Sequence, residues 1–155
     1  MKKNIFIFIF LFISFTLSSQ YTGATPWSNC FGKNAPCKYV GCSDIKVDAS
    51  EDPVLVIVKK YNKVIKHAYI AGNRSYTFEL PDGTYQVFFY YGNNWNSRKK
   101  MKSDECSYAF GGWEKNEYVS KDNPISLRGQ VMTYTLTKVT YGNFTPKSSN
   151  LDEAL

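Results

Sequence analysis

The segment from Gly92 to Trp113 holds the side chains best suited to binding chemistry. An indole ring stacks on the apolar face of a sugar, neighbouring amides hydrogen-bond its hydroxyl groups, and cations attract carboxylates or phosphates. The candidate binding residues are Asn94, Trp95, Asn96, Arg98, Lys99, Lys100, Lys102 and Trp113. Because a long irregular segment in a compact domain is usually functional or disordered, we expect a loop here, and we take binding of a glycan or an anionic polymer as its candidate function.

A structural interpretation of the same loop competes with the binding one. Trp95, Phe110 and Trp113 can cover a sheet edge, while the lysines keep the tip soluble. Large aromatic side chains usually contribute burial before they contribute recognition. The sequence therefore favours the structural interpretation and leaves the binding site as a hypothesis to test.

The four cysteines are Cys30, Cys37, Cys42 and Cys106. An even number in an exported chain favours two disulfides over free thiols, and three pairings are possible. We expect Cys30 to pair with Cys37 in a small loop. Cys42 then pairs with Cys106, since Cys42 abuts the first strand and Cys106 lies in an otherwise unanchored segment. The spacing Cys-x6-Cys-x4-Cys lacks a Cys-x2-Cys knuckle, so we expect neither a metal nor another cofactor.

Catalytic groups are sparse. The single histidine, His67, shares strand parity with Ile65 and Tyr69, so we expect it half-buried beside Tyr69 or facing solvent, without a partner for general-base chemistry. A cysteine–histidine nucleophile needs an unpaired thiol, against the even cysteine count. The sequence has no Gly-x-Ser-x-Gly elbow, phosphate loop or His-Glu-x-x-His motif. We expect no catalytic activity, and a small thiol or hydrolytic enzyme is the remote alternative.

The first 19 residues have the composition of a secretory signal peptide. Lys2 and Lys3 precede an apolar run from Ile5 to Leu17, which closes on two serines. A membrane span needs about 20 apolar residues, so this shorter run favours a cleaved signal over an uncleaved anchor. Cleavage would leave Gln20 as the first residue of a secreted or periplasmic protein, with no stable membrane span after the signal is removed.

The mature chain from Gln20 to Leu155 is long enough for one domain. Removing Lys2 and Lys3 leaves 17 basic and 13 acidic residues, a net charge of +4. This modest charge attracts anionic surfaces only weakly. The basic run is short and no nucleic-acid-reading module surrounds it, so nucleic acid is not an expected partner.

After the predicted signal peptide, most of the sequence has the residue patterns of β-strands. Ser75 to Leu80 alternates apolar and polar residues, Pro81-Asp82-Gly83 forms a turn, and Thr84 to Tyr91 is apolar on both faces. We expect a β-hairpin here, with its second strand inside a sheet. Further strands are expected at 45–49, 54–60, 64–71 (antiparallel to 54–60), within 118–127 and at 130–141.

These patterns predict an all-β fold, an antiparallel β-sandwich of about seven strands with disulfides and one long loop. The expected segments are a signal peptide at 1–19, an irregular cysteine-containing lead-in at 20–43, the sandwich at 44–141 and a tail at 142–155. In the tail, Ser149 or Asn150 can cap a helical turn that carries Asp152 and Glu153. This acidic tail is suited to pairing with the basic loop.

The run from His67 to Trp95, HAYIAGNRSYTFELPDGTYQVFFYYGNNW, resembles the core of an uncharacterised family of small exported bacterial proteins. That family also carries a Thr-Gly-x-x-Pro-aromatic motif, which here spans Thr22 to Trp27. The SYTFELPDGTYQV stretch is more loosely similar to the Gly-x-Tyr hairpin of carboxypeptidase-regulatory-like and PEGA-type sandwich modules, which are accessory domains of surface proteins. The resemblance implies a fold class and no specific activity.

The expected function is that of an exported, non-catalytic binding or structural module of the cell envelope or extracellular space. Its expected partner is an envelope polymer or glycan, bound through residues 92–113. The alternative is an assembly subunit that docks on an envelope protein through Thr22 to Trp27 or a sheet edge.

Overall fold

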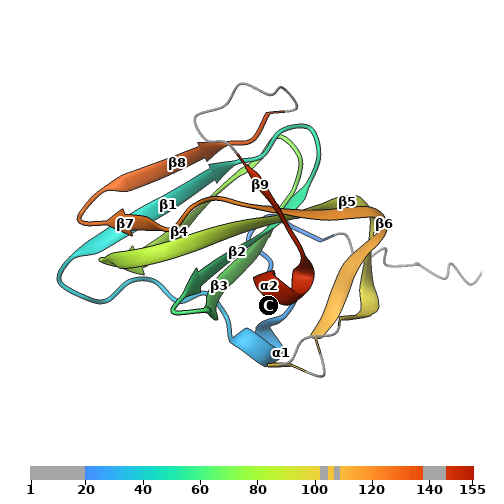
Figure 1. Ribbon diagram of the computed structural model, residues 1–155, viewed down its shortest axis with the longest axis horizontal. Coiled ribbons are helices and arrows are strands. Elements are labelled where there is room, and N and C mark those ends of the chain that lie inside the picture. The colour runs from blue at the N-terminus through green and yellow to red at the C-terminus, as the bar shows by residue number, and fades with distance from the viewer. Residues whose placement is uncertain (1–19, 102–104, 107–108, 138–145) are drawn as a thin grey trace, which may run out of the picture.

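The computed structural model describes residues 20–101, 105–106, 109–137 and 146–155 (Figure 1). The predicted signal peptide and Lys102 lie outside the described residues. Both helices of the described part, α1 (Ser28–Phe31) and α2 (Leu151–Ala154), are single turns, far shorter than a bilayer span. The rest of the regular structure is β, and two packed sheets confirm the expected all-β sandwich.

The smaller sheet has three strands in the order β4-β1-β8. β1 (Cys42–Asp48) pairs antiparallel with β4 (Ser75–Pro81) and parallel with β8 (Val131–Thr135). The predicted strand at 45–49 is therefore present, and the one at 130–141 is shorter than predicted within the described residues. The parallel β1–β8 pair departs from the antiparallel pairing expected throughout.

The larger sheet has the order β3-β2-β5-β6-β9, and β7 also pairs with β5. Its strands are β2 (Val54–Lys60), β3 (Lys63–Ile70), β5 (Gly83–Met101), β6 (Ala109–Lys121), β7 (Ile125–Leu127) and β9 (Lys147–Ser149). All of these pairs are antiparallel. The predicted β2–β3 pairing is confirmed, and nine strands are found in the described residues where about seven were expected.

The predicted hairpin of β4 with β5 is wrong. β4 pairs with β1, whereas β5 lies between β2 and β6, so Pro81-Asp82-Gly83 carries the chain from one sheet to the other. The two strands also differ in burial. In β4, Phe78 and Leu80 are buried and alternate with accessible residues, whereas residues 87–90 of β5 are buried on both faces of the sheet. A turn motif fixes that the chain reverses, but does not fix which strand it pairs with next.

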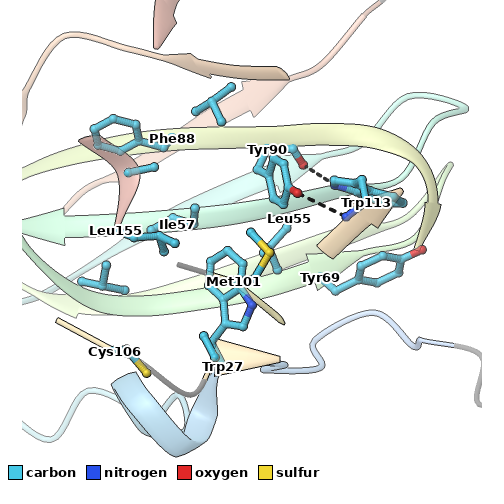
Figure 2. Packing of buried hydrophobic residues seen from close by; sticks show 14 of the residues in the cluster. Trp27, Leu55, Ile57, Tyr69, Phe88, Tyr90, Met101, Cys106, Trp113 and Leu155 are labelled. Atoms are coloured by element: carbon cyan, nitrogen blue, oxygen red, sulfur yellow. Dashed lines mark hydrogen bonds between the residues drawn. The ribbon is translucent and has the colours of Figure 1, made fainter. Parts of the chain in front are cut away.

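Two apolar cores lie on opposite faces of the larger sheet. Between the sheets, Val56 and Phe89 pack against Ile45 and Phe78 of the smaller sheet. On the other face, Leu55 and alternate residues of β5 pack under a cover made of α1, α2 and the far ends of β5 and β6 (Figure 2). The alternation of side chains along β2 and β5 therefore supplies both cores, which is why these strands read as continuous apolar runs.

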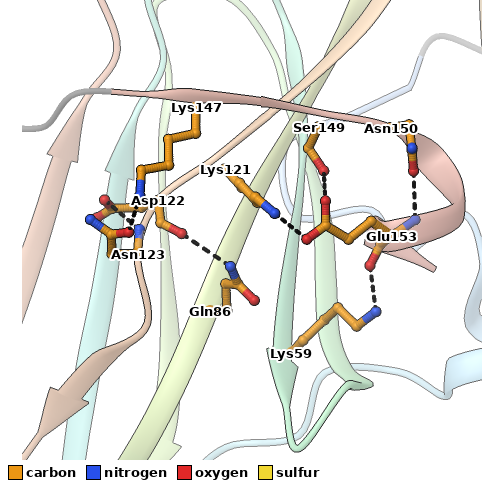
Figure 3. A network of polar contacts seen from close by, with 9 residues as sticks. All are labelled: Lys59, Gln86, Lys121, Asp122, Asn123, Lys147, Ser149, Asn150 and Glu153. Carbon is orange, nitrogen blue, oxygen red and sulfur yellow. Dashed lines mark hydrogen bonds and ion pairs between the residues drawn. The ribbon is translucent and has the colours of Figure 1, made fainter.

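The tail packs on the sandwich. Asn150 caps α2 by accepting the backbone N–H of Glu153 at 2.8 Å, as predicted, and Leu155 is buried. The Glu153 carboxylate pairs with Lys121 of β6, and its carbonyl accepts from Lys59, which is 8% exposed (Figure 3). Among the described residues the acidic tail thus meets lysines of the sheet and not the basic segment at 98–100, so that prediction is wrong.

Candidate binding surface on the long β-arm

The predicted loop from Gly92 to Trp113 is mostly β-structure. β5 continues to Met101 and β6 begins at Ala109, and the two strands pair as far as Met101 with Ala109. We call this extension, residues 92–113, the β-arm. Its register shifts twice, between Tyr91 and Asn93 and between Asn96 and Lys100. These irregularities break the period-two pattern, which explains why the sequence signal for a strand lapses here.

Both tryptophans of the β-arm face other side chains. Trp113 is 1% exposed, and its Nε1–H donates to the Tyr90 carbonyl at 3.1 Å (Figure 2). Trp95 is half-buried, with its ring edge-on to Trp113 at 5.0 Å and 5.4 Å from Tyr69. Gly92 permits this packing, since a Cβ there would lie 2.3 Å from the Trp113 Cβ. The two rings supply burial, as the structural interpretation holds, while Phe110 is exposed.

The polar candidates of the β-arm divide into engaged and exposed groups. The Asn96 side chain donates to Glu114 and accepts the Arg98 backbone N–H, and Lys99 forms a 2.9 Å ion pair with Glu117. The exposed candidates are Asn94, Arg98 and Lys100. Asn94 lies between the two register shifts and has a φ of +57°, a backbone region in which asparagine is favoured. The β-arm therefore offers an amide and two cations to a ligand, without a free indole face.

A hydrogen-bond network that runs from the buried Tyr90 to the exposed Glu117 fixes the base of the β-arm. The Tyr90 hydroxyl accepts the backbone N–H of Trp113 at 3.2 Å and donates to Glu117, which also pairs with Lys99. Burial, with the Glu117 hydrogen bond adding to it, raises the pKa of Tyr90 far above its usual range. Tyr90 therefore stays protonated and serves as a donor.

Replacing Tyr90 with phenylalanine is expected to lower the free energy of unfolding by about 1–3 kcal/mol, because the buried Trp113 N–H loses its acceptor. Urea unfolding measures this change. Tyr118→Phe is the matched control, since Tyr118 is 59% exposed and the substitution keeps its ring stacked on Tyr91. Equal losses in the two variants would contradict a structural role for the Tyr90 hydroxyl.

The N-terminal segment from Thr22 to Trp27 is part of the fold. The Thr22 hydroxyl accepts the Ala71 N–H at 3.0 Å. Along the edge of β3, the Gly23 N–H donates to the Tyr69 carbonyl at 2.8 Å, and the Ala24 carbonyl accepts the Tyr69 N–H at 2.9 Å. Trp27 is fully buried. This segment therefore covers part of the edge of β3. Docking of a protein partner through it stays a prediction.

The predicted disulfide pairing is wrong, although both disulfides exist. Cys30 pairs with Cys106 and Cys37 with Cys42. The β-arm curls over the larger sheet and brings Cys106 into the second core beside α1, which carries Cys30. This curl could not be predicted from the sequence, because the register shifts of the β-arm interrupt the alternating pattern by which its strands would be recognised.

His67 is fully buried, so neither predicted position is correct. Its Nε2 accepts the backbone N–H of Trp27 at 3.0 Å, and its ring stacks on the Trp27 indole. Burial lowers the His67 pKa to about 4, with the Thr25 backbone opposing the shift. Its Nδ1 has no hydrogen-bond partner among the described residues. This environment keeps the ring neutral and uses it to hold the N-terminal segment on β3.

A shallow hollow of about 220 Å³ lies between residues 34–36 and β4. Its charged groups are engaged, since Lys66 donates to the Ala35 carbonyl and Glu79 accepts the Cys37 N–H at 3.1 Å. The described residues contain no cluster of three or more histidine, cysteine or acidic side chains suited to a metal ion. The hollow and the exposed Tyr39 and Val40 beside it in sequence are not among the predicted site residues.

Comparisons with known proteins add no further identification. No protein-family model matches the chain, and neither a curated protein nor a solved structure is significantly similar to it.

Proposed function

We propose that this protein is an exported, non-catalytic binding or structural module of the cell envelope or extracellular space. The observation that carries the proposal is that all four cysteines are in disulfides. One fastens the lead-in to β1, and the other fastens α1 to the tip of the β-arm. Disulfides of this kind persist in oxidising compartments outside the cytosol. The signal-like leader points to the same compartment.

Rigid attachment is also what a binding module needs, because a surface that is already ordered loses little entropy when it binds. The burial and low pKa of His67 remove the single histidine from general-base chemistry near neutral pH, which supports the non-catalytic part of the proposal. The partner class we propose is an envelope polymer or glycan, or an envelope protein. On the β-arm, such a partner would meet Asn94, Arg98 and Lys100.

Sedimentation of the purified mature protein with isolated cell walls and a panel of glycans tests this function. We expect binding that weakens as salt rises, because charges at an exposed surface are screened. If the β-arm is the site, Arg98→Gln combined with Lys100→Gln weakens binding, whereas the exposed lead-in substitution Lys33→Gln does not. A binding function would be contradicted if the protein bound to none of the envelope fractions, including those that contain envelope proteins or lipids.

A further inference from the structure

Four chain reversals meet at one end of the sandwich, at residues 37–42, 60–63, 81–83 and 128–131. We call this the four-turn end, and Figure 1 shows it toward the left. Asp82 joins three of the turns: its backbone N–H donates to the Gly41 carbonyl at 3.1 Å, and its carboxylate accepts the Gly129 N–H at 2.8 Å. The fourth turn joins through Lys60, whose Nζ lies 5.3 Å from the Tyr85 ring.

Exposed apolar side chains concentrate at this end. Of the seven large hydrophobic residues exposed in the described chain, four belong to it: Tyr39, Val40, Tyr61 and Val131. Tyr61 is 88% exposed and Val40 is 108% exposed, so neither ring nor methyl groups are buried by the fold. The disulfide between Cys37 and Cys42 closes the loop that holds Tyr39 and Val40. Folding leaves Tyr39 and Val40 exposed in this closed loop, so a partner that covered them would bury apolar surface that the fold does not.

The charges of the four-turn end are mainly positive. Its cations are Lys38, Lys60, Lys63 and Arg128, and Asp82 is its single carboxylate. Asp82 is engaged with the Ser43 hydroxyl at 2.6 Å and with Gly129, and these hydrogen bonds lower its pKa. Lys38, Lys63 and Arg128 are therefore exposed around the apolar tips, whereas Lys60 is half-buried with its Nζ near the Tyr85 ring.

We propose that the four-turn end docks the protein on an anionic lipid bilayer surface. Tyrosine rings have an apolar body and a polar end, which suits the boundary between headgroups and acyl chains. Val40 has no flat face and no hydrogen-bonding group, so it suits that boundary better than it suits a sugar. Lysine and arginine near the surface are attracted to anionic headgroups. This inference rests on the proposed export, since it takes the bilayer as the envelope partner.

Co-sedimentation of the mature protein, residues 20–155, with vesicles tests the inference. Vesicles of phosphatidylcholine and phosphatidylglycerol at 3:1 are compared with pure phosphatidylcholine. We expect at least about tenfold tighter binding to the anionic vesicles. Val40→Asp and the pair Lys38→Gln, Lys63→Gln are each expected to weaken that binding about tenfold or more. Because these side chains are exposed, the melting temperature of each variant should stay at the wild-type value.

Tyr21→Asp and Lys115→Gln are the matched controls. Tyr21 is 72% exposed and lies near the other end of β3, and Lys115 is exposed on β6, where it pairs with Asn93 beside the β-arm. Neither substitution should therefore change vesicle binding. Vesicle binding that Val40→Asp leaves intact would overturn the inference, because another surface would then carry it. Binding to cell-wall polymers or envelope proteins without binding to vesicles would overturn the inference and leave the proposed function standing. Binding to none of these would overturn both.

Discussion

Replacing Cys30 and Cys106 together with serine is expected to lower the free energy of unfolding by about 4 kcal/mol. The cysteines are 76 residues apart, so their bond removes much chain entropy from the unfolded state. The bond also fastens the tip of the β-arm to α1, over a core that contains Trp27 and Met101. Urea unfolding of the oxidised mature chain measures the change.

The Cys37→Ser, Cys42→Ser pair is the matched control. These cysteines are only 5 residues apart, and the same entropy argument gives about 2 kcal/mol for so short a loop. The long disulfide should therefore matter about twice as much as the short one. Equal losses, or a larger loss for the short loop, would contradict the arrangement in which Cys106 holds the β-arm on α1.

Acidification from pH 6.5 to pH 4 is expected to remove about 3 kcal/mol of stability through His67 alone. The native pKa of about 4 is below the ordinary value of 6.5, so over this range the unfolded chain binds a proton that the native protein does not. The contribution is present in full above pH 6.5 and is lost as the pH falls through 4. Carboxylates with lowered pKa, such as Glu153, act only at the acid end of this window.

The chain has one histidine, so its ring protons can be followed without assignment. We expect a single Hε1 resonance whose chemical shift titrates with a midpoint near pH 4. A midpoint between pH 6 and 7 would contradict the buried position of His67. His67→Gln keeps an acceptor for the Trp27 N–H but has no titrating group. Its free energy of unfolding should therefore change little between pH 6.5 and 4.5, whatever its absolute stability.

The strands themselves could be predicted from the sequence because they follow side-chain periodicity. Val54–Lys60 was predicted to the residue, and the apolar pattern on both faces of 84–91 correctly indicated a strand inside a sheet. Which strands pair with each other could not be predicted in the same way. The turn at Asp82 looks like a hairpin turn, but β4 has one buried face and β5 has two, and only the assembled cores decide where each belongs.

The candidate site shows the same division between local and non-local information. Of the candidate binding residues at 94–100, Asn94, Arg98 and Lys100 are exposed, and their role in binding stays a prediction. The burial of Trp113 depends on its hydrogen bond to Tyr90 and on close packing against Gly92, which has no side chain. Both contacts form only in the folded β-arm. The prediction of the disulfide pairing was wrong for the same reason, because Cys30 and Cys106 come together only when the β-arm curls.

Peptide mapping of the unreduced protein, recovered from outside the cytoplasm, tests most directly the claim that this is an exported module held together by its disulfides. We expect a chain that begins at Gln20 and two linked peptide pairs, Cys30 with Cys106 and Cys37 with Cys42. A cytoplasmic chain that retains Met1 and reacts with alkylating agents at its cysteines would contradict it. Linkage of Cys42 to Cys106 would contradict the curled β-arm.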